Sequence, residues 1–287
     1  MQMRSIEISA GTGCYCIFGR PVSHSVSPLM HNAAFRECSI DAVYLAFEPQ
    51  SIGEAVASMK SLGIRGASVT IPFKIDALRH CDEVDHIAAD IGSVNTLVNR
   101  GGLVKGFNTD GYGAARALEE SGIALKGAVC LVIGNGGSAR AIAFTLIESG
   151  ASVIIAGRNA GRVERLAEDL CKRAPGTRSL LMDTIDSGLM ESVDIIINTT
   201  PVGMTPDVGS MPLEKSLISA SHAVFDIVYA PHMTRLLSAA RDSGSRIVHG
   251  IDMLVYQGAR QFELWTGKPA PVKTMMKAAR RHLQRAT

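Results

Sequence analysis

The sequence predicts an α/β fold with a doubly wound, Rossmann-type parallel sheet in the middle of the chain. Short apolar runs alternate with amphipathic stretches from end to end, which is typical of strands followed by helices. Six of these runs are predicted as the strands of one sheet, at residues 129–133, 152–156, 179–182, 194–197, 223–227 and 246–249. A glycine-rich turn directly follows the first run, as it does in sheets of this kind.

The composition narrows the class of protein. The chain has 287 residues, 46% of them hydrophobic, and a formal net charge of +2 from scattered basic residues. This length allows two domains, and the absence of a basic patch argues against nucleic acid as a partner. No apolar run approaches the ~18 residues of a membrane span, and the first residues lack the pattern of a secretory signal. The six cysteines have no zinc spacing, so we expect reduced thiols in a cytoplasmic protein without a metal site.

The first third of the chain predicts a smaller α/β domain. Its strands are predicted at residues 14–18, 42–47, 67–70, 94–99 and 103–107. The last two form a hairpin around Gly101-Gly102. A helix is expected over 51–62, because Ser51 suits the N-cap and Glu54 completes a capping box. Two more helices are predicted near the end, over 251–265 and 271–284. The predicted divisions are a substrate-binding domain at 1–112, the Rossmann domain at 113–249, and C-terminal helices at 250–287 that pack on the first domain.

The glycine-rich turn has the residues that a dinucleotide needs. It reads Gly134-Asn135-Gly136-Gly137-Ser138-Ala139, a G-x-G-x-x-A pattern between a strand and an amphipathic helix. Gly134 allows the tight turn, Gly136 lets the backbone approach a pyrophosphate, and Ala139 permits close helix packing. The phosphates then meet N–H groups at the helix N-terminus. A glycine pattern alone also occurs in ordinary turns, but here the strand and helix around it favour a dinucleotide site.

The end of the second Rossmann strand bears on the choice between NAD and NADP. An NAD enzyme usually has an acidic residue there that binds the ribose 2′-hydroxyl. This chain has Gly157-Arg158-Asn159, with Arg162 four positions after Arg158. Two guanidinium groups can hold a 2′-phosphate by charge-assisted hydrogen bonds, which favours NADP. The alternative is a pair of solvated arginines at the start of a surface helix.

Polar residues also gather at predicted strand ends in the first domain. Ser25 and Ser27 precede a helix predicted over 29–36, with Ser27 as its N-cap, and this arrangement suits a carboxylate as well as ordinary capping. Lys74 and Asp110 each follow an apolar strand. Strand ends are where the ligand sites of α/β proteins lie.

Over almost its whole length the chain resembles the shikimate dehydrogenase family. The matching stretches follow the family's order and approximate spacing: Ser25-x-Ser27-Pro28, Val69-Thr70-Ile71-Pro72-Phe73-Lys74, Asn95-Thr96, Asn108-Thr109-Asp110-Gly111, the Gly134 loop, Asn198-Thr199-Thr200-Pro201-Val202-Gly203-Met204 and the Gln257 helix. Each is weak alone, and the joint match is specific. The resemblance implies NADPH-dependent, reversible reduction of 3-dehydroshikimate to shikimate in aromatic amino acid biosynthesis, by a monomer or a homodimer.

The resemblance also implies a role for individual residues. Lys74 and Asp110 would be the catalytic pair at the C3 oxygen, and Ser25 and Ser27 would hold the substrate carboxylate. The other residues implied at the substrate are Ser68, Thr70, Asn95, Tyr229 and Gln257. The residues implied at NADP are Gly134, Asn135, Gly136, Gly137, Ser138, Arg158, Asn159 and Arg162, with Ile227 and Gly250 beside the nicotinamide.

Two positions depart from the family's pattern. Many relatives have Asn where this chain has Ser68, which bears on substrate preference. A common form of the cofactor segment is Asn-Arg-Thr, where this chain has Gly157-Arg158-Asn159 and keeps the arginine. A quinate or quinate/shikimate dehydrogenase would share the fold and the catalytic pair. A non-catalytic NADP-binding sensor on the same fold would lack the pair, whereas Lys74 and Asp110 are both present.

Overall fold

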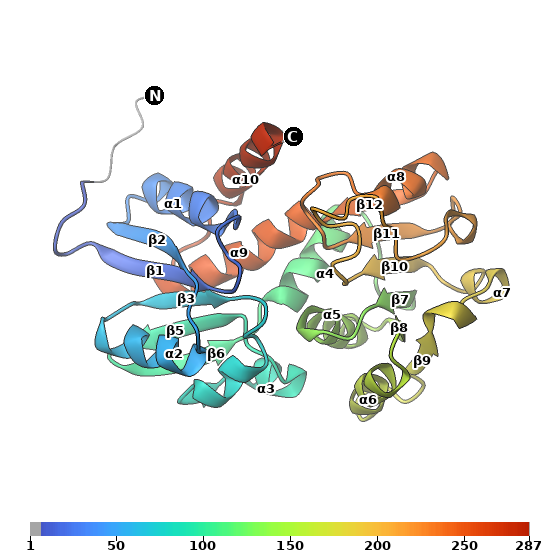
Figure 1. Ribbon diagram of the computed structural model, residues 1–287, viewed down its shortest axis with the longest axis horizontal. Helices are drawn as coiled ribbons and strands as arrows, with labels where there is room; N and C mark the ends of the chain where they lie inside the picture. The colour runs from blue at the N-terminus through green and yellow to red at the C-terminus, as the bar shows by residue number, and fades with distance from the viewer. Residues whose placement is uncertain (1–6, 287) are drawn as a thin grey trace. The chain divides into compact units, whose positions relative to one another are not determined.

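The computed structural model describes residues 7–286, with side chains up to residue 283 (Figure 1). The chain divides into two compact units, and each contains one six-stranded sheet. The first unit is made of the chain up to Thr109 together with Gln257–Ala286, and the second is Asp110–Tyr256. Strands and helices alternate in both units, which confirms the predicted α/β class.

The sheet of the first unit has mixed strand directions. Its strands are β1 (Gly13–Phe18), β2 (Ala42–Phe47), β3 (Gly66–Val69), β4 (Glu83–Val84), β5 (Thr96–Arg100) and β6 (Leu103–Phe107). In the order β2-β1-β3-β5-β6-β4, β1 is parallel to both neighbours, while β5 is antiparallel to β3 and β6. The predicted β5–β6 hairpin is therefore confirmed. It turns at Gly101 and Gly102, whose φ angles of 63° and 92° favour glycine.

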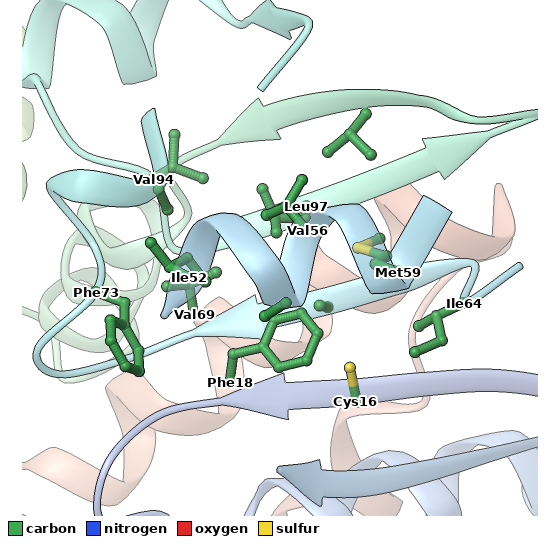
Figure 2. Packing of buried hydrophobic residues seen from close by; sticks show 14 of the residues in the cluster. Cys16, Phe18, Ile52, Val56, Met59, Ile64, Val69, Phe73, Val94 and Leu97 are labelled. Atoms are coloured by element: carbon green, nitrogen blue, oxygen red, sulfur yellow. The ribbon is translucent and has the colours of Figure 1, made fainter. Parts of the chain in front are cut away.

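Helices surround this sheet, and one of them shows how its core is built. They are α1 (Ser27–Glu37), α2 (Ile52–Ser61), α3 (His86–Ile91), α10 (Val272–Ala286), the 3₁₀ helix η1 (Asp76–His80), and α9 (Gly250–Thr266), which begins in the second unit. Helix α2 begins as predicted, because the Ser51 side chain accepts a hydrogen bond from the Glu54 N–H. Its buried residues Ile52, Val56 and Met59 pack over β1 and β3 (Figure 2).

The second unit is a doubly wound sheet, as predicted. Its strands are β7 (Val129–Ile133), β8 (Ser152–Gly157), β9 (Arg178–Leu181), β10 (Ile195–Asn198), β11 (Ala223–Asp226) and β12 (Arg246–His249). All pairs are parallel, in the order β12-β11-β10-β7-β8-β9. The strand order therefore reverses between β7 and β10, and a crevice at the carboxyl ends of these strands is where such sheets bind ligands.

The helices of the second unit connect these strands. They are α4 (Asp110–Glu120), α5 (Gly137–Glu148), α6 (Ala160–Cys171), α7 (Ser187–Met190) and α8 (Arg235–Asp242), with 3₁₀ helices η2 (Met182–Thr184) and η3 (Lys215–Leu217). Within residues 7–286, no helix has the length and apolar character needed to cross a bilayer. The same residues contain no cluster of three potential metal ligands. All six cysteines are free thiols.

One predicted helix start is wrong. Helix α1 begins at Ser27, two residues before the predicted start, and its N-cap is Val26 rather than Ser27. The Val26 backbone is already near the helical region, with φ −79° and ψ −16°, so the turn starts one residue earlier. At this N-terminus the Ser25 hydroxyl accepts a hydrogen bond from the Ser27 N–H at 3.3 Å.

Candidate functional site

The glycine-rich turn after β7 requires glycine for steric reasons. Gly134 has φ +126°, and an added Cβ would lie 2.3 Å from Thr199 Oγ1. Thr199 is itself fixed, because its hydroxyl donates to the Ile133 carbonyl at 2.7 Å. The turn at Gly134 therefore packs directly against the segment that follows β10, on the other side of the point where the strand order reverses.

Gly136 is glycine for a different reason. It is the N-cap of α5, and a Cβ added there would meet no heavy atom within 4 Å. The open space lies beside the N–H groups of the first turn of α5, where the helix carries partial positive charge. A side chain at this position would fill the space that a pyrophosphate needs. The residues of this turn therefore fit a dinucleotide.

The end of β8 has the charge that a phosphate requires. Gly157 is buried against Val163, and the exposed Arg158 follows it. Asn159 is the N-cap of α6, since its Oδ1 accepts from the Arg162 N–H at 3.1 Å. Within residues 7–286 no acidic side chain pairs with Arg158 or Arg162. Two unpaired cations at a helix N-terminus are unfavourable alone, and a bound 2′-phosphate would offset that cost.

The carboxyl ends of β10 and β11 are joined by a buried carboxylate, Asp226, which is not among the predicted site residues. Asp226 Oδ1 accepts from Asn198 Nδ2 and from the Val228 N–H, both at 3.0 Å. Its Oδ2 accepts from the Thr234 hydroxyl at 2.7 Å. Burial outweighs these hydrogen bonds and raises the pKa of Asp226 to about 6. We call this group of hydrogen bonds the clamp at Asp226. It connects the end of β10 to the segment that follows β11, which contains Tyr229.

Two of the predicted nicotinamide residues lie against each other. Ile227 directly follows β11, and Gly250 is the first residue of α9. A Cβ added at Gly250 would lie 2.4 Å from the Ile227 carbonyl oxygen, so only glycine allows this approach. Tyr229 lies two residues beyond Ile227, is half-buried, and has its pKa raised by burial.

Asp110 occupies the first position of α4 and is buried, with 4% of its surface exposed. Ser138, at the start of α5, donates a hydrogen bond to Asp110 Oδ2 at 3.4 Å. Gly111 allows α4 and α5 to approach each other, because a Cβ at this position would lie 1.9 Å from Thr145 Oγ1. Within the second unit, the predicted catalytic carboxylate and a predicted cofactor residue are therefore in contact.

The predicted substrate amides are brought together in the first unit. Asn95 precedes β5, is 2% exposed, and receives the Thr109 N–H on its Oδ1 at 2.8 Å. Its Nδ2 lies 3.1 Å from Thr109 Oγ1 and 3.4 Å from Gln257 Oε1. Gln257 comes from α9, far along the chain. These contacts join three separate segments of the chain in one buried polar cluster.

Lys74 and Thr70 lie in the loop that follows β3, and both are half-buried. The Lys74 carbonyl accepts from the Val94 N–H at 2.8 Å, which ties this loop to the segment that contains Asn95. Lys74 belongs to the first unit and Asp110 to the second. The pairing of their side chains therefore stays a prediction.

Ser68 lies on β3 and is only 5% exposed. Its hydroxyl accepts from Tyr44 at 2.6 Å and donates to Gln261 Oε1 at 2.7 Å. Burial raises the pKa of Tyr44 well above its usual value, and hydrogen bonding with Ser68 and Ser27 acts in the opposite direction. Sequence reasoning missed Tyr44 and Gln261. The available signal was the spacing of Gln261, one helical turn after Gln257.

Known protein families match the chain over most of its length. Three family models match the chain: the shikimate dehydrogenase substrate binding domain at residues 17–97, shikimate / quinate 5-dehydrogenase at 115–230, and the shikimate 5′-dehydrogenase C-terminal domain at 250–280. A protein of Moorella thermoacetica named shikimate dehydrogenase (NADP(+)) is 43% identical over 96% of this chain and 95% of its own length.

The chain belongs to the shikimate dehydrogenase family.

Solved structures of the family share its fold. A shikimate dehydrogenase in complex with NADP⁺ superposes with a TM-score of 0.91 at 37% identity, covering 96% of this chain and 98% of that one. The Thermus thermophilus shikimate 5-dehydrogenase, in complex with NADP(H) and shikimate, gives 0.87 at 35% identity, covering 95% and 100%. Family membership therefore extends over both units.

Proposed function

We propose that this protein is a shikimate dehydrogenase that uses NADPH to reduce 3-dehydroshikimate reversibly to shikimate, a step of aromatic amino acid biosynthesis. The observation that carries the proposal is sequence identity over nearly the full length to relatives named for this activity. It is supported by the glycine turn at the point where the Rossmann strand order reverses, and by the two unpaired arginines after β8.

The cofactor is assigned to residues of the second unit. Gly134–Ser138 would hold the pyrophosphate, and Arg158 and Arg162 would hold the 2′-phosphate. Asn159 fixes the first turn of α6 and so orients Arg162. Ile227 and Gly250 would line the nicotinamide end, where the absence of a Cβ at Gly250 allows its close contact with the Ile227 carbonyl.

The substrate is assigned mainly to residues of the first unit. Ser25 and Ser27 would hold the carboxylate at the N-terminus of α1, where the helix dipole favours an anion. The remaining contacts, to the ring and its hydroxyls, are assigned to Thr70, Asn95, Gln257 and Tyr229.

The reaction requires a proton donor at the C3 oxygen. When bound, NADPH supplies the hydride that reduces the ring ketone. The Lys74 ammonium stabilises the negative charge that develops on the C3 oxygen and donates a proton from Nζ. Asp110, the predicted partner of Lys74, would orient the lysine. In shikimate oxidation Lys74 accepts the same proton, so one group serves both directions.

The direct test is a substrate panel under initial-rate conditions. Shikimate, quinate and related hydroxy acids are each offered with NADP⁺ and with NAD⁺. We expect shikimate with NADP⁺ to give the highest kcat/KM. Quinate oxidation of equal or greater efficiency would favour a quinate/shikimate dehydrogenase, which the matching family model also includes. No turnover of any acid would favour a cofactor-binding sensor.

We further propose a cytoplasmic location, which the six free thiols support because such thiols persist in reducing compartments. Each chain carries a full set of the predicted site residues, so we expect activity from a monomer or a homodimer. Light scattering after size-exclusion chromatography of the active fraction distinguishes these states.

A further inference from the structure

A chain of buried hydrogen bonds in the first unit leads to Asn95, one of the predicted substrate residues. It starts at the Tyr44 phenol, which donates to Ser68 Oγ at 2.6 Å. Ser68 in turn donates to Gln261 Oε1 at 2.7 Å. None of the three residues is more than 5% exposed, so water does not compete for these contacts.

The same chain continues to Asn95. Gln261 Nε2 donates to the Asn95 carbonyl at 3.2 Å and to Thr96 Oγ1 at 3.0 Å. The Thr96 hydroxyl then donates to Asn95 Oδ1 at 2.7 Å. A path of side chains therefore connects Tyr44 on β2 to the side-chain amide of Asn95.

The direction of every hydrogen bond in this path is fixed by two backbone groups. The Asn95 carbonyl can only accept, so the Gln261 nitrogen faces it and the Gln261 oxygen faces Ser68. Ser68 must then donate its single proton to Gln261, and Tyr44 must donate to Ser68. At the other end the Thr109 N–H can only donate, so it faces Asn95 Oδ1, and Asn95 Nδ2 is the donor that lies toward Thr109 Oγ1 and Gln257 Oε1.

The start of the path is held rigidly by aromatic packing. The Tyr44 ring stacks on His31, with centroids 4.5 Å apart and planes 17° apart, and lies 5.9 Å from the Trp265 ring. His31 is completely buried, and burial lowers its pKa to about 3, so the stacked imidazole is neutral. The phenol therefore has little freedom to leave Ser68.

We propose that Tyr44, Ser68 and Gln261 are positioning residues that hold the Asn95 amide in the orientation that donates to a ring hydroxyl of the substrate. The inference rests on the proposed function, because it assigns Asn95 to that hydroxyl. The proposal changes the role of Ser68. Because buried Ser68 donates its proton to Gln261 and accepts from Tyr44, it acts through Asn95 instead of contacting the substrate.

Removing the Ser68 hydroxyl has a defined consequence. In Ser68→Ala the Tyr44 proton and the Gln261 oxygen both lose their partners, so Gln261 keeps the contacts of its Nε2 but is held less rigidly against Asn95 and Thr96. We expect kcat/KM for shikimate to fall by about tenfold, mostly through KM, because a hydroxyl contact is made in the ground state as well as in the transition state.

The test is a double-mutant cycle between Ser68→Ala and Asn95→Ala, measured as kcat/KM for shikimate with NADP⁺. If Ser68 acts through Asn95, the tenfold loss shrinks to less than about twofold when Asn95 is already alanine. Equal losses in both backgrounds would overturn the proposal. Tyr44→Phe, which removes the start of the path and leaves Ser68 intact, is combined with Asn95→Ala in the same way if Ser68→Ala does not fold.

Asn99→Ala is the matched control. Asn99 lies near the other end of β5 and makes three hydrogen bonds with backbone groups, to the Met59 and Ile64 carbonyls and from the Gly102 N–H. It should lower thermal stability and leave kcat/KM within about twofold. An equal kinetic loss in this control would mean that general loosening explains the Ser68 effect. A wild-type chain that does not oxidise shikimate would overturn the proposed function itself, whereas additive losses in an active enzyme overturn only the positioning role.

Discussion

Lys74 is a half-buried residue in a loop, and nothing in its local sequence distinguishes it from an ordinary surface lysine. Its proposed role predicts an effect on turnover. The ammonium interacts most strongly when charge develops on the C3 oxygen, so Lys74→Ala should lower kcat by ~100- to 10,000-fold and raise KM much less. Steady-state kinetics with shikimate and NADP⁺ measure both parameters.

The partnership with Asp110 is tested in the same assay. Asp110→Asn should also lose turnover, since the amide keeps the shape of the carboxylate without its charge. If the two residues act as one unit, the double variant is scarcely slower than Lys74→Ala alone. Near-normal kcat in Lys74→Ala, with only weaker substrate binding, would make the lysine a binding residue and require another proton donor.

Arg158 allows a prediction on the cofactor. A lost phosphate contact of ~1.4 kcal/mol corresponds to a tenfold change in affinity, so Arg158→Ala should weaken NADP⁺ binding by about tenfold or more. Binding of NAD⁺, which has no 2′-phosphate, should not change. Calorimetric titration of both cofactors measures this difference.

The control for Arg158 is Arg165→Ala. Arg165 is an exposed arginine on α6, and its Nε donates to the Gly161 carbonyl at 2.8 Å. The Arg165→Ala variant changes the net charge by the same amount as Arg158→Ala, and Arg165 has no predicted role at the phosphate. Equal weakening by both variants would assign the effect to long-range attraction, which added salt screens.

At the scale of elements, the apolar pattern located the strands well because strands buried on both faces are apolar throughout. Each of the six predicted Rossmann strands is present, and its observed bounds differ by no more than one residue at either end. Strand β4 and helix α3 were not predicted. Two and six residues long, they are too short to show a period. The start of α1 was placed wrongly because serine is a favoured cap, whereas the backbone at Val26 was already helical.

The clamp at Asp226 ties β10 to β11, and its pKa gives it a signature in stability. The native pKa of about 6 is above the usual value of about 3.9, so the folded protein binds this proton more tightly than the unfolded chain. The contribution to the free energy of unfolding is therefore greatest below pH ~4 and falls as pH rises to ~6, by on the order of 3 kcal/mol. Urea unfolding of wild type and Asp226→Asn across this range should reveal the difference.

Thr234→Val gives the second arm of that experiment. The variant removes a hydrogen bond that lowers the pKa of Asp226 and leaves the carboxyl able to titrate. The pH-dependent step should therefore remain and move to higher pH. A difference between wild type and Asp226→Asn that is constant from pH 4 to 7 would show that Asp226 keeps an ordinary pKa.

For the molecule as a whole, the strongest prediction concerns selectivity. Shikimate should be oxidised with a higher kcat/KM than quinate, and NADP⁺ should be preferred to NAD⁺. Ser68→Asn examines the departure from the family's pattern. The hydroxyl it replaces lies within 2.7 Å of Tyr44 and Gln261, so the longer amide must displace one of them, and we expect lower activity with shikimate.

The same molecule shows which parts of a site can be predicted from sequence. Lys74, Asn95 and Gly134 follow or precede strands, and fold topology gathers strand ends, so their positions were predictable in outline. The contact between Ser68 and Gln261 joins residues 193 positions apart. No local pattern encodes such a contact, because its partner is determined by how α9 packs on the first sheet.

The discontinuous first unit has a consequence for protein synthesis. Its strands leave the ribosome first, but Gln257–Ala286, which supplies most of α9 and all of α10, emerges only after the whole second unit. Until then the surface of α1 that α10 covers is bare, and the Leu97 carbonyl lacks the Trp265 indole that donates to it at 3.0 Å. Domains usually fold in the order in which they are made. Here the contiguous second unit should become protease-resistant first, and a nascent chain arrested just after Tyr256 should remain cleavable between β1 and β6.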